Sequence, residues 1–464
     1  MPPKFGTSGL RGLVRDLSES VVSAHVGAFL AACPVGSGLC VGRDLRASSP
    51  RIAEWVARAA QARGVPVRDC GPLPTPALAL HAAALGAGAI MVTGSHIPAD
   101  RNGLKFYSVA GEITKDDEAR ILAAMASLSR PAAELAPVVA DPDAIEAYRE
   151  RHIRAFGAGV LSGLRVGVFT HSAVGRDALV GLLAELGAET VELGRSETFV
   201  PVDTEACGAD ILGALRGWAS DHDLVAILST DGDGDRPLVA DERGALVPGD
   251  VLGQMAAAVL GADVAVTPVS SNTGAELGCR FRRVLRTRIG SPFVIAGMME
   301  TGGRVAGYEA NGGFLLGFEA TGPAGPLAPL RTRDAMLPML VSLWRTACGV
   351  PLSDQVAAEP ARFTASDRRA GVSPEAGRAF LQRLMRQRAA TEAFLESIGA
   401  SCLAASDVTD GLRMTLTDGR ILHLRPSGNA PEFRVYAEAG SPQGARDLCA
   451  AGIAGVAAEL GRAD

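Results

Sequence analysis

The chain has 464 residues, of which 47% are hydrophobic and 21% charged, and its formal net charge at pH 7 is −6. This composition is typical of a folded globular protein, and the length predicts roughly three or four domains of about 100–200 residues each. The acidic balance argues against nucleic acid as the main partner but leaves a small anionic substrate open.

Other features of the sequence bear on the cellular compartment. No apolar run reaches the roughly 18 residues that a membrane span needs, and the N-terminus lacks the basic and apolar regions of a signal peptide. The eight cysteines show no C-x-x-C or zinc-like spacing, so we expect small buried thiols in a reducing environment. We therefore expect a cytoplasmic protein, a monomer or homodimer, with no membrane partner.

The first 140 residues alternate between helical and strand patterns. Helices are expected at 20–32, 50–63 and 77–85, and strands at 39–42, 65–69 and 89–92. This alternation predicts an α/β domain with a mostly parallel sheet, in which ligands bind at the carboxyl ends of the strands. Alanines and prolines at 131–142 indicate a linker after it.

Two glycine-rich stretches of this domain carry polar side chains. Residues 6–12, Gly-Thr-Ser-Gly-Leu-Arg-Gly, could bind an anion through backbone N–H groups, with a flexible terminal loop as the alternative. The strand at 89–92 leads into Thr93-Gly94-Ser95-His96, and Pro98 and Gly103 predict that the chain then stays in a loop.

Ser95 is well placed for chemistry because it follows a buried strand. Gly94 lets the backbone approach a ligand closely, and His96 and Lys105 can supply protons or positive charge. Taken alone, the motif is more typical of an ordinary turn, so its importance depends on partners elsewhere in the chain.

A second α/β segment contains a run of acidic residues. Strands are expected at 164–170, 190–193 and 224–228, with a helix at 178–186. The third strand leads into Asp231-Gly-Asp233-Gly-Asp235-Arg236, where three carboxylates can converge on one hard cation, most simply Mg²⁺. A calcium loop fits less well because a strand precedes it, and a solvated acidic turn is the other alternative.

A third α/β segment follows. Helices are expected at 249–260 and 334–344, and strands at 262–269 and 304–307. The second strand ends in Tyr-Glu309-Ala-Asn311-Gly-Gly, where a carboxylate and an amide could hydrogen-bond vicinal hydroxyl groups of a sugar. A plain turn is the alternative.

The pattern changes near Pro360 to alternating runs at 412–416 and 421–424, which predict antiparallel strands in a smaller α+β unit. This unit contains a polar loop followed by a strand at 435–437. Backbone N–H groups and charged or polar side chains there predict a phosphate site, formed by Arg425, Ser427, Gly428 and Asn429.

Together, these four loops and the opening glycine-rich segment resemble the signature loops of the α-D-phosphohexomutases. That family includes phosphomannomutases, phosphoglucomutases and phosphoglucosamine mutases, and the resemblance covers essentially the whole chain. The sequence departs from the family pattern at three positions: Ile97 stands where Asn is usual, Asn311 where Ser is usual, and Asn429 where Thr is frequent. The second departure bears on the choice of sugar.

The resemblance implies three similar α/β domains with mixed, mostly parallel sheets, and a smaller α+β C-terminal domain, around a central cleft. The expected domains are 1–140 with the phosphoserine loop, 141–245 with the metal loop, 246–358 with the sugar loop and 359–464 with the phosphate loop.

The resemblance also implies a role for each site residue. Ser95 would carry a phosphate, and Mg²⁺ would bind to Ser95, Asp231, Asp233 and Asp235. Positive charge or proton transfer would come from Arg11, Arg236, His96 and Lys105. The substrate would contact Glu309, Asn311, Arg425, Ser427, Gly428 and Asn429.

The activity implied is transfer of a phosphate between C6 and C1 of a hexose, through a sugar bisphosphate that also acts as activator. Mannose 6-phosphate is the expected substrate, with phosphoglucomutase or phosphoglucosamine mutase activity as alternatives. A phosphosugar hydrolase and a non-catalytic phosphosugar-binding protein are alternatives of another class. The intact serine and aspartates argue against the binding protein, and a second phosphate site argues against the hydrolase.

Overall fold

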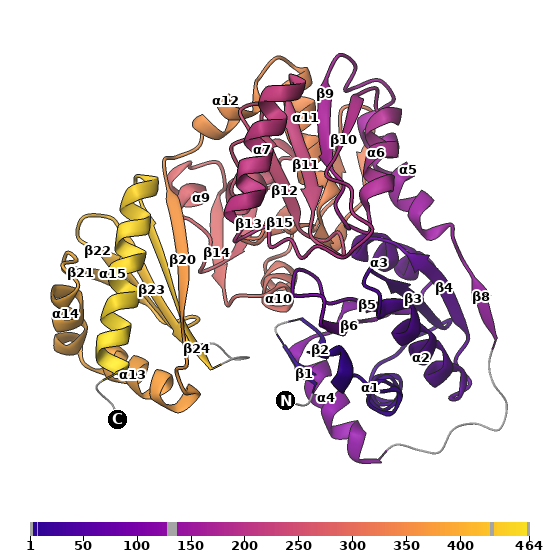
Figure 1. Ribbon diagram of the computed structural model, residues 1–464, viewed down its shortest axis with the longest axis horizontal. Helices are drawn as coiled ribbons and strands as arrows, with labels where there is room; N and C mark the ends of the chain where they lie inside the picture. The colour runs from indigo at the N-terminus through magenta and orange to yellow at the C-terminus, as the bar shows by residue number, and fades with distance from the viewer. Residues whose placement is uncertain (1–2, 7, 128–136, 427–430, 462–464) are drawn as a thin grey trace. The chain divides into compact units, whose positions relative to one another are not determined.

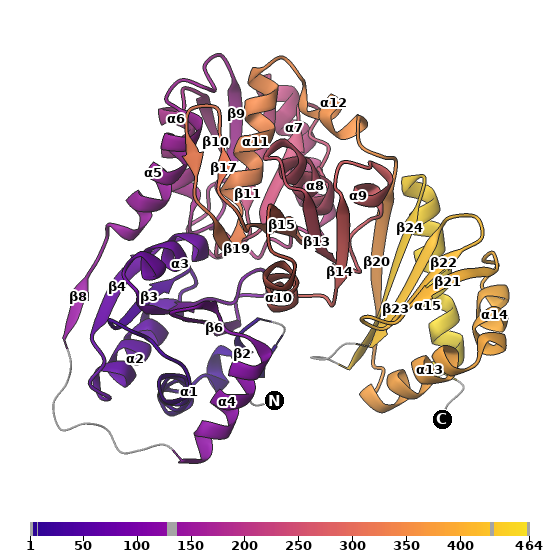
Figure 2. The ribbon, with the colours of Figure 1, turned by 180° about the vertical axis from the view of Figure 1, so that it is seen from behind.

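The computed structural model describes residues 3–6, 8–127, 137–426 and 431–461 (Figures 1 and 2). Its contacts divide the chain into two compact units, Met1–Ala265 with Gly290–Ala358, and Val266–Ile289 with Glu359–Asp464. None of the helices in the described ranges combines the length and apolar character needed to span a bilayer.

The N-terminal part of the first unit is a mixed sheet of eight strands. Their order is β1-β2-β6-β5-β3-β4-β8, and β7 pairs with β6. Pairing is parallel among β3, β4, β5 and β8 and antiparallel around β1, β2, β6 and β7. The strands are β1 (Lys4–Phe5), β2 (Leu10–Leu13), β3 (Leu39–Arg43), β4 (Val67–Pro72), β5 (Gly88–Val92), β6 (Arg101–Ser108), β7 (Gly111–Glu112) and β8 (Val138–Ala140).

Helices cover both faces of this sheet. Three lie on one face, α1 (Glu19–Ala32), α2 (Ser49–Gln61) and α4 (Lys115–Ala124), and α3 (Thr75–Ala84) lies on the other (Figures 1 and 2). Short 3-10 turns are η1 (Val14–Asp16) and η2 (Met125–Ser127). Leu39 and Val41 of β3 pack with Val26 of α1 and Val56 of α2 in one apolar core. The predicted alternation of helices and strands is confirmed, with ends shifted by a few residues.

The expectation of a loop through Gly103 is wrong, because β6 begins at Arg101. This strand pairs with both β2 and β5, and that tertiary pairing overrides the local glycine signal. A Cβ on Gly103 would lie 2.0 Å from the backbone oxygen of Leu10, so glycine permits the close pairing. The expected linker also contains β8, which joins the first sheet.

A second sheet in the same unit has the order β10-β9-β11-β12. The first three strands are parallel and β12 is antiparallel, as the sequence predicts for an α/β segment. Thr230 pairs with Pro237, so the acidic loop closes the β11–β12 hairpin. The elements are α5 (Ala144–Phe156), β9 (Arg165–Phe169), α6 (Arg176–Glu185), β10 (Glu189–Leu193), α7 (Ala209–His222), β11 (Ala226–Thr230) and β12 (Pro237–Asp241).

The remaining part of the first unit contains antiparallel pairs β15–β16 and β16–β19, and the turn between β15 and β16 carries Glu309 and Asn311. The strands here are β15 (Val305–Tyr308), β16 (Phe314–Leu316), β17 (Ala320–Thr321), β18 (Pro326–Leu327) and β19 (Leu330–Asp334). The helices are α8 (Gly249–Val259), α10 (Ser291–Thr301), α11 (Met336–Ala347) and α12 (Leu352–Ala357). The division between the two units falls within β13 (Val264–Pro268).

The second unit is built on an antiparallel sheet of order β20-β24-β23-β22-β21, which confirms the predicted α+β segment. Alternate residues such as Leu422 and Leu424 enter a core that helices α13, α14 and α15 cover. The elements are α9 (Gly274–Leu277), β14 (Arg283–Thr287), β20 (Phe363–Ala370), α13 (Pro374–Arg386), α14 (Arg388–Ser397), β21 (Leu403–Asp407), β22 (Leu412–Leu416), β23 (Ile421–Pro426), β24 (Glu432–Ala439) and α15 (Pro442–Leu460).

All eight cysteines are free thiols, but the expectation that they are buried holds only in part. Buried side chains are those of Cys33, Cys40, Cys70 and Cys449. Cys207 is half-buried, and the exposed ones are Cys279, Cys348 and Cys402.

Candidate active site

Ser95 lies just beyond the end of β5 in an unusual backbone conformation. Its φ is 53°, in the left-handed region that residues other than glycine seldom adopt. Its backbone N–H donates to Thr93 Oγ1 at 2.7 Å, and its side chain is buried. Such strain persists only where the surroundings impose it, and it is frequent at functional sites.

Arg46 imposes much of that conformation. Its buried guanidinium donates to four backbone carbonyl oxygens of the serine loop, which belong to Ser95 (2.8 Å), Ile97 (2.5 Å), Pro98 (2.6 Å) and Arg101 (3.0 Å). A Cβ on Gly94 would lie 2.6 Å from this guanidinium, so the glycine lets the arginine approach the backbone.

Asp44 completes the support of the loop. Its carboxylate accepts hydrogen bonds from Thr93 Oγ1 at 2.7 Å and from the Gly94 backbone at 3.3 Å, and it pairs with Arg46 Nε at 3.1 Å. The polar turn after β3 therefore positions the serine loop.

The three aspartates of the β11–β12 hairpin converge as predicted. Asp231, Asp233 and Asp235 are fully buried, and one carboxylate oxygen from each lies within 4.8 Å of the others. Asp231 Oδ1 accepts from the backbone N–H of Asp235 at 3.2 Å, which folds the loop tightly around its first carboxylate.

The serine loop and the aspartate loop meet directly. Ser95 Oγ donates to Asp231 Oδ2 at 2.6 Å. A Cβ on Gly232 would lie 2.8 Å from the Ser95 carbonyl oxygen, so a glycine between the first two aspartates permits this approach. The structure thus brings together the two motifs that the sequence marked most strongly.

Buried cations surround the carboxylates. Lys105 Nζ lies 2.5 Å from Asp233 Oδ2 and 2.5 Å from Asp235 Oδ2. Arg333, which the sequence reasoning missed, contacts Asp235 Oδ2 at 2.7 Å. Thr75, also missed, donates to Asp233 Oδ2 at 2.6 Å.

Two predicted arginines lie at the same place. Burial lowers the pKa of Arg11 to about 10, partly opposed by the nearby charges of Asp233 and Asp235. Arg236 Nε lies 3.9 Å from Asp235 Oδ1. Two guanidinium groups thus add to the fixed positive charge of the site.

The carboxylates differ in their preference for protons. Burial, followed by the charges of Asp233 and Asp235, raises the pKa of Asp231 well above its usual range. Burial opposes ionisation of Asp233 too, but the Lys105 ammonium holds the pKa of that carboxyl below its usual range. The charges of Arg236 and Lys105 offset this effect only in part, so Asp231 is less well compensated than Asp233.

A divalent metal ion fits these residues. Among the described residues, the buried atoms Asp233 Oδ1 and Asp235 Oδ1 have no hydrogen-bond partner. Such oxygens are costly to bury, and three converging carboxylates are the ligand type that hard cations prefer. The aspartate group could therefore hold a metal ion.

His96 lies beside the serine but carries no charge at neutral pH. Its Nδ1 is 3.3 Å from Ser95 Oγ. The Arg236 charge, burial and the Arg11 charge together lower the pKa of His96 to about 2. The ring can therefore accept or donate a hydrogen bond. It does not supply positive charge, which was one of the two roles that the sequence left open for it.

Glu309 and Asn311 are buried in the β15–β16 turn and connect to the aspartates through Arg333. Arg333 Nη1 lies 3.3 Å from Glu309 Oε2 while the same guanidinium contacts Asp235. Asn311 Oδ1 accepts from the Gly313 backbone at 3.0 Å. The predicted sugar loop and the predicted metal loop thus share one arginine.

The fourth predicted loop is described only at its edge. Arg425, in the second unit, pairs through Nε with Asp410 Oδ1 at 3.0 Å. Ser427, Gly428 and Asn429 lie outside the described residues. Their expected phosphate contacts stay a prediction.

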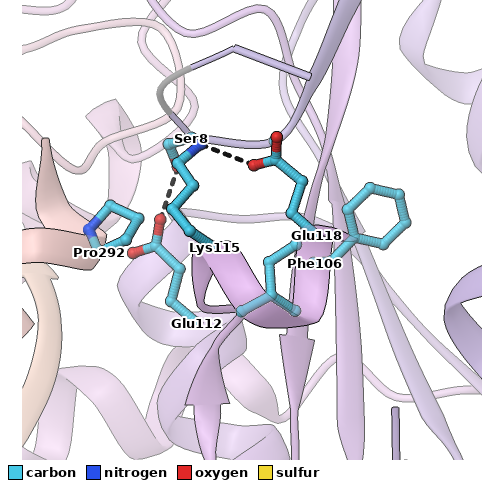
Figure 3. Close-up of a pocket in the computed structure, with 8 residues that line it drawn as sticks. Ser8, Phe106, Glu112, Lys115, Glu118 and Pro292 are labelled. Carbon is cyan, nitrogen blue, oxygen red and sulfur yellow. Dashed lines mark hydrogen bonds and ion pairs between the residues drawn. The ribbon is translucent and has the colours of Figure 1, made fainter. Parts of the chain in front are cut away.

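A small pocket adjoins the N-terminal glycine-rich loop (Figure 3). Ser8 Oγ donates to Glu112 Oε1 at 2.6 Å, and Lys115 Nζ contacts Glu118 Oε2 at 2.6 Å. The ammonium group is thus already paired with a carboxylate, whereas Arg11 lies by the aspartates. Within the described part of this loop, an anion is therefore expected to bind at Arg11 and not in this pocket.

A buried serine next to a carboxylate group that could hold a metal ion, with cations around them, is the arrangement expected of an enzyme of phosphoryl transfer. Family models for phosphoglucomutase/phosphomannomutase match the chain in four parts. Alpha/beta/alpha domains I, II and III match residues 2–131, 147–244 and 247–363, and the C-terminal domain matches 359–454. The chain belongs to this family and is an α-D-phosphohexomutase, an isomerase.

Named relatives agree with this assignment. The chain is 43% identical over 471 residues to a phosphomannomutase of Sinorhizobium fredii, covering 98% of each chain. It is 42% identical over 467 residues to a phosphomannomutase of Salmonella muenchen, covering 99% of this chain and 96% of that one. A phosphoglucosamine mutase of Rhodococcus jostii is more distant, at 30% identity over 96% of this chain and 97% of that one.

The fold also matches a solved structure. A phosphoglucomutase/phosphomannomutase family protein from Burkholderia thailandensis superposes with a TM-score of 0.77 at 20% identity, covering 98% of this chain and 97% of that chain.

Proposed function

We propose that this phosphohexomutase is a phosphomannomutase that interconverts mannose 6-phosphate and mannose 1-phosphate through a phosphoserine at Ser95. The contact that carries the proposal is the 2.6 Å hydrogen bond from Ser95 Oγ to Asp231 within the buried carboxylate group. The two phosphomannomutase relatives, at 43% and 42% identity, favour mannose phosphate over glucosamine phosphate.

In this proposal the chain mainly positions groups and neutralises charge, as phosphoryl transfer requires. Ser95 donates its phosphate to the sugar phosphate and recovers the other phosphate from the resulting bisphosphate. Arg11 and Arg236 stabilise negative charge on the transferring group. Lys105 holds two of the aspartates in place, and neutral His96 exchanges hydrogen bonds with the serine oxygen or a sugar hydroxyl.

We propose Mg²⁺ as the metal ion, bound by Asp231, Asp233, Asp235 and the phosphate or hydroxyl oxygen of Ser95. When bound, the ion polarises the phosphoryl oxygens. The fit rests on the three converging buried carboxylates, two of which have an oxygen without a hydrogen-bond partner among the described residues.

The remaining residues are proposed to recognise the substrate. Glu309 accepts hydrogen bonds from sugar hydroxyls through Oε1, because Arg333 already contacts Oε2. Asn311 uses its Nδ2 donor, because its Oδ1 accepts from the loop backbone. The phosphate that is not reacting binds to Arg425, Ser427, Gly428 and Asn429. A hexose 1,6-bisphosphate serves as activator.

We also propose the domain organisation that the sequence implies, with divisions near residues 140, 245 and 358, and a cytoplasmic monomer or homodimer. Gel filtration with light scattering measures the oligomeric state. A mass well above that of a dimer would contradict a monomer or homodimer.

An assay of three sugar 1-phosphates tests the proposed function, with Mg²⁺ and a hexose bisphosphate present. Mannose and glucose differ only at C2, so discrimination of a few kcal/mol at most is expected. We expect turnover of mannose 1-phosphate, measurable turnover of glucose 1-phosphate and much poorer turnover of glucosamine 1-phosphate. A kcat/KM for glucosamine 1-phosphate above those for the other two sugar phosphates would overturn the assignment of mannose phosphate as the substrate. Release of inorganic phosphate in place of the 6-phosphate would indicate a hydrolase, and binding without turnover a binding protein.

A further inference from the structure

A second cluster of metal-ligand side chains lies in the N-terminal sheet, away from the aspartates. Cys40 of β3, Cys70 of β4 and His81 of α3 place their sulfur and nitrogen atoms within 4.8 Å of one another. Both sulfurs belong to buried residues. The three residues are 30 and 11 positions apart along the chain, so no zinc-like spacing marks them in the sequence.

The strand register explains how the two cysteines meet. Leu39 and Val41 enter the core under α1 and α2, so Cys40 points to the opposite face, where α3 lies. Opposite Val41 and Gly42, the register of β4 shifts from Asp69 to Gly71, which leaves Cys70 as an extra residue. Bulges of this kind re-aim a side chain and are rare between parallel strands.

His81 has a carboxylate against its ring. Its Nε2 lies 2.9 Å from Asp141 Oδ2, and Arg68 Nη1 contacts the same oxygen at 3.2 Å. A carboxylate behind a histidine fixes the tautomer and raises the basicity of the other ring nitrogen, and most metal-binding histidines have such a partner.

The separation of the ligand atoms suits a tetrahedral ion. Ligands at about 2.3 Å from a central zinc lie roughly 3.8 Å apart, so a contraction of at most about 1 Å closes the cluster.

We propose that Cys40, Cys70 and His81 form a zinc site, with Asp141 as the carboxylate behind the histidine and a water molecule completing the coordination. Thiolate and imidazole ligands select a soft ion, whereas the aspartate group selects a hard one. Cys40 pairs with Ala89 near the start of β5, and Ser95 follows the other end of that strand. The ion would therefore tie β3, β4 and α3 together without touching substrate.

Cobalt substitution tests the proposal on the full chain, reduced, treated with a chelator and then saturated with Mg²⁺. Co²⁺ bound by thiolate gives a charge-transfer absorption that the oxygen ligands of the aspartate group cannot give. We expect one such Co²⁺ per chain, which Zn²⁺ displaces. We also expect bound Zn²⁺ to protect two thiols from alkylation. Wild-type protein carries this measurement, so it does not depend on a variant that folds poorly.

Variants then assign the ligands. Cys40→Ala and Cys70→Ala should remove the absorption, whereas Cys33→Ala, a buried cysteine in the same sheet domain, should retain it. Asp141→Asn should weaken Zn²⁺ binding by about 10–100-fold, an effect that a merely structural carboxylate would not have. Absence of the absorption in reduced wild-type protein, or its retention in Cys70→Ala, would overturn the site. A Cys40–Cys70 disulfide on mild oxidation, with no Zn²⁺ binding after reduction, would overturn it too.

Discussion

The guanidinium of Arg46 lies 2.8 Å from the carbonyl oxygen of Ser95, and both residues are buried. The same group reaches three further carbonyl oxygens of that loop, so one side chain fixes the backbone that carries the proposed nucleophile. The left-handed φ of Ser95 shows that this conformation is imposed rather than locally preferred.

Arg46→Lys should therefore lower kcat by about 10–100-fold, because a point ammonium cannot reproduce a planar fork of donors and small misplacements are costly in catalysis. KM should change less, since Arg46 is placed behind the loop. Steady-state kinetics measure both, with Tm as a check on folding. Arg51→Lys, at an arginine that lies over the Trp55 ring, is the control. A kcat within twofold of wild type would remove Arg46 from this positioning role.

Ser95→Ala should reduce mutase turnover by about 10³-fold or more, even with hexose bisphosphate supplied, because no other group takes the phosphate. Intact-mass measurement after incubation with the bisphosphate should show one added phosphate on wild type and none on the variant. Ser37→Ala, which loses only a hydrogen bond to the Leu85 backbone, should behave as wild type. Near-normal turnover of Ser95→Ala would assign the nucleophile elsewhere.

Asp233→Asn should raise the Mg²⁺ concentration needed for half-maximal activity by about tenfold or more, since one of three converging charges is lost. It should also weaken the contact with Lys105, which lies 2.5 Å from the carboxylate. Mg²⁺ titration of activity tests this, with Asp177→Asn as the control at an aspartate paired only with Arg195 on the surface. Identical activation curves for the Asp233 variant and wild type would exclude a metal role for this carboxylate.

The sequence predicts the alternation of elements, because that depends on local patterns. The meeting of the serine and aspartate loops follows only from the resemblance to the phosphohexomutases. Prediction from local patterns fails where long-range pairing decides. Gly103 signals a loop, yet β6 is a strand because β2 and β5 flank it.

The buried arginines show the same limit. Arg46 and Arg333 are buried, whereas an arginine in a sequence is ordinarily expected in solvent, because it is almost never fully buried unless paired. A signal was present in each case, for both arginines adjoin or nearly adjoin an aspartate, in Asp44-Leu-Arg46 and Arg333-Asp334. Only the fold shows that Arg333 instead joins Asp235 to Glu309.

The last prediction concerns pH and the second unit. His423 is buried beside Tyr436, and its Nε2 lies 2.6 Å from the Asp410 carbonyl oxygen. Burial lowers the pKa of His423 to about 4, so the folded unit keeps a neutral ring where the unfolded chain, with a pKa near 6.5, takes up a proton. Its contribution to stability is therefore complete above about pH 6.5 and is lost as the pH falls toward 4.

Between those pH values the free energy of unfolding should fall by up to about 3 kcal/mol through this residue, at 1.36 kcal/mol per pKa unit. Urea unfolding followed by circular dichroism, at pH 7 and pH 4.5, compares wild type with His423→Gln. The variant should be less stable at pH 7 but should lose less stability on acidification, whereas His222→Gln, at the last residue of α7, should follow wild type. Parallel acid losses in wild type and His423→Gln would show that this ring does not titrate as its burial requires.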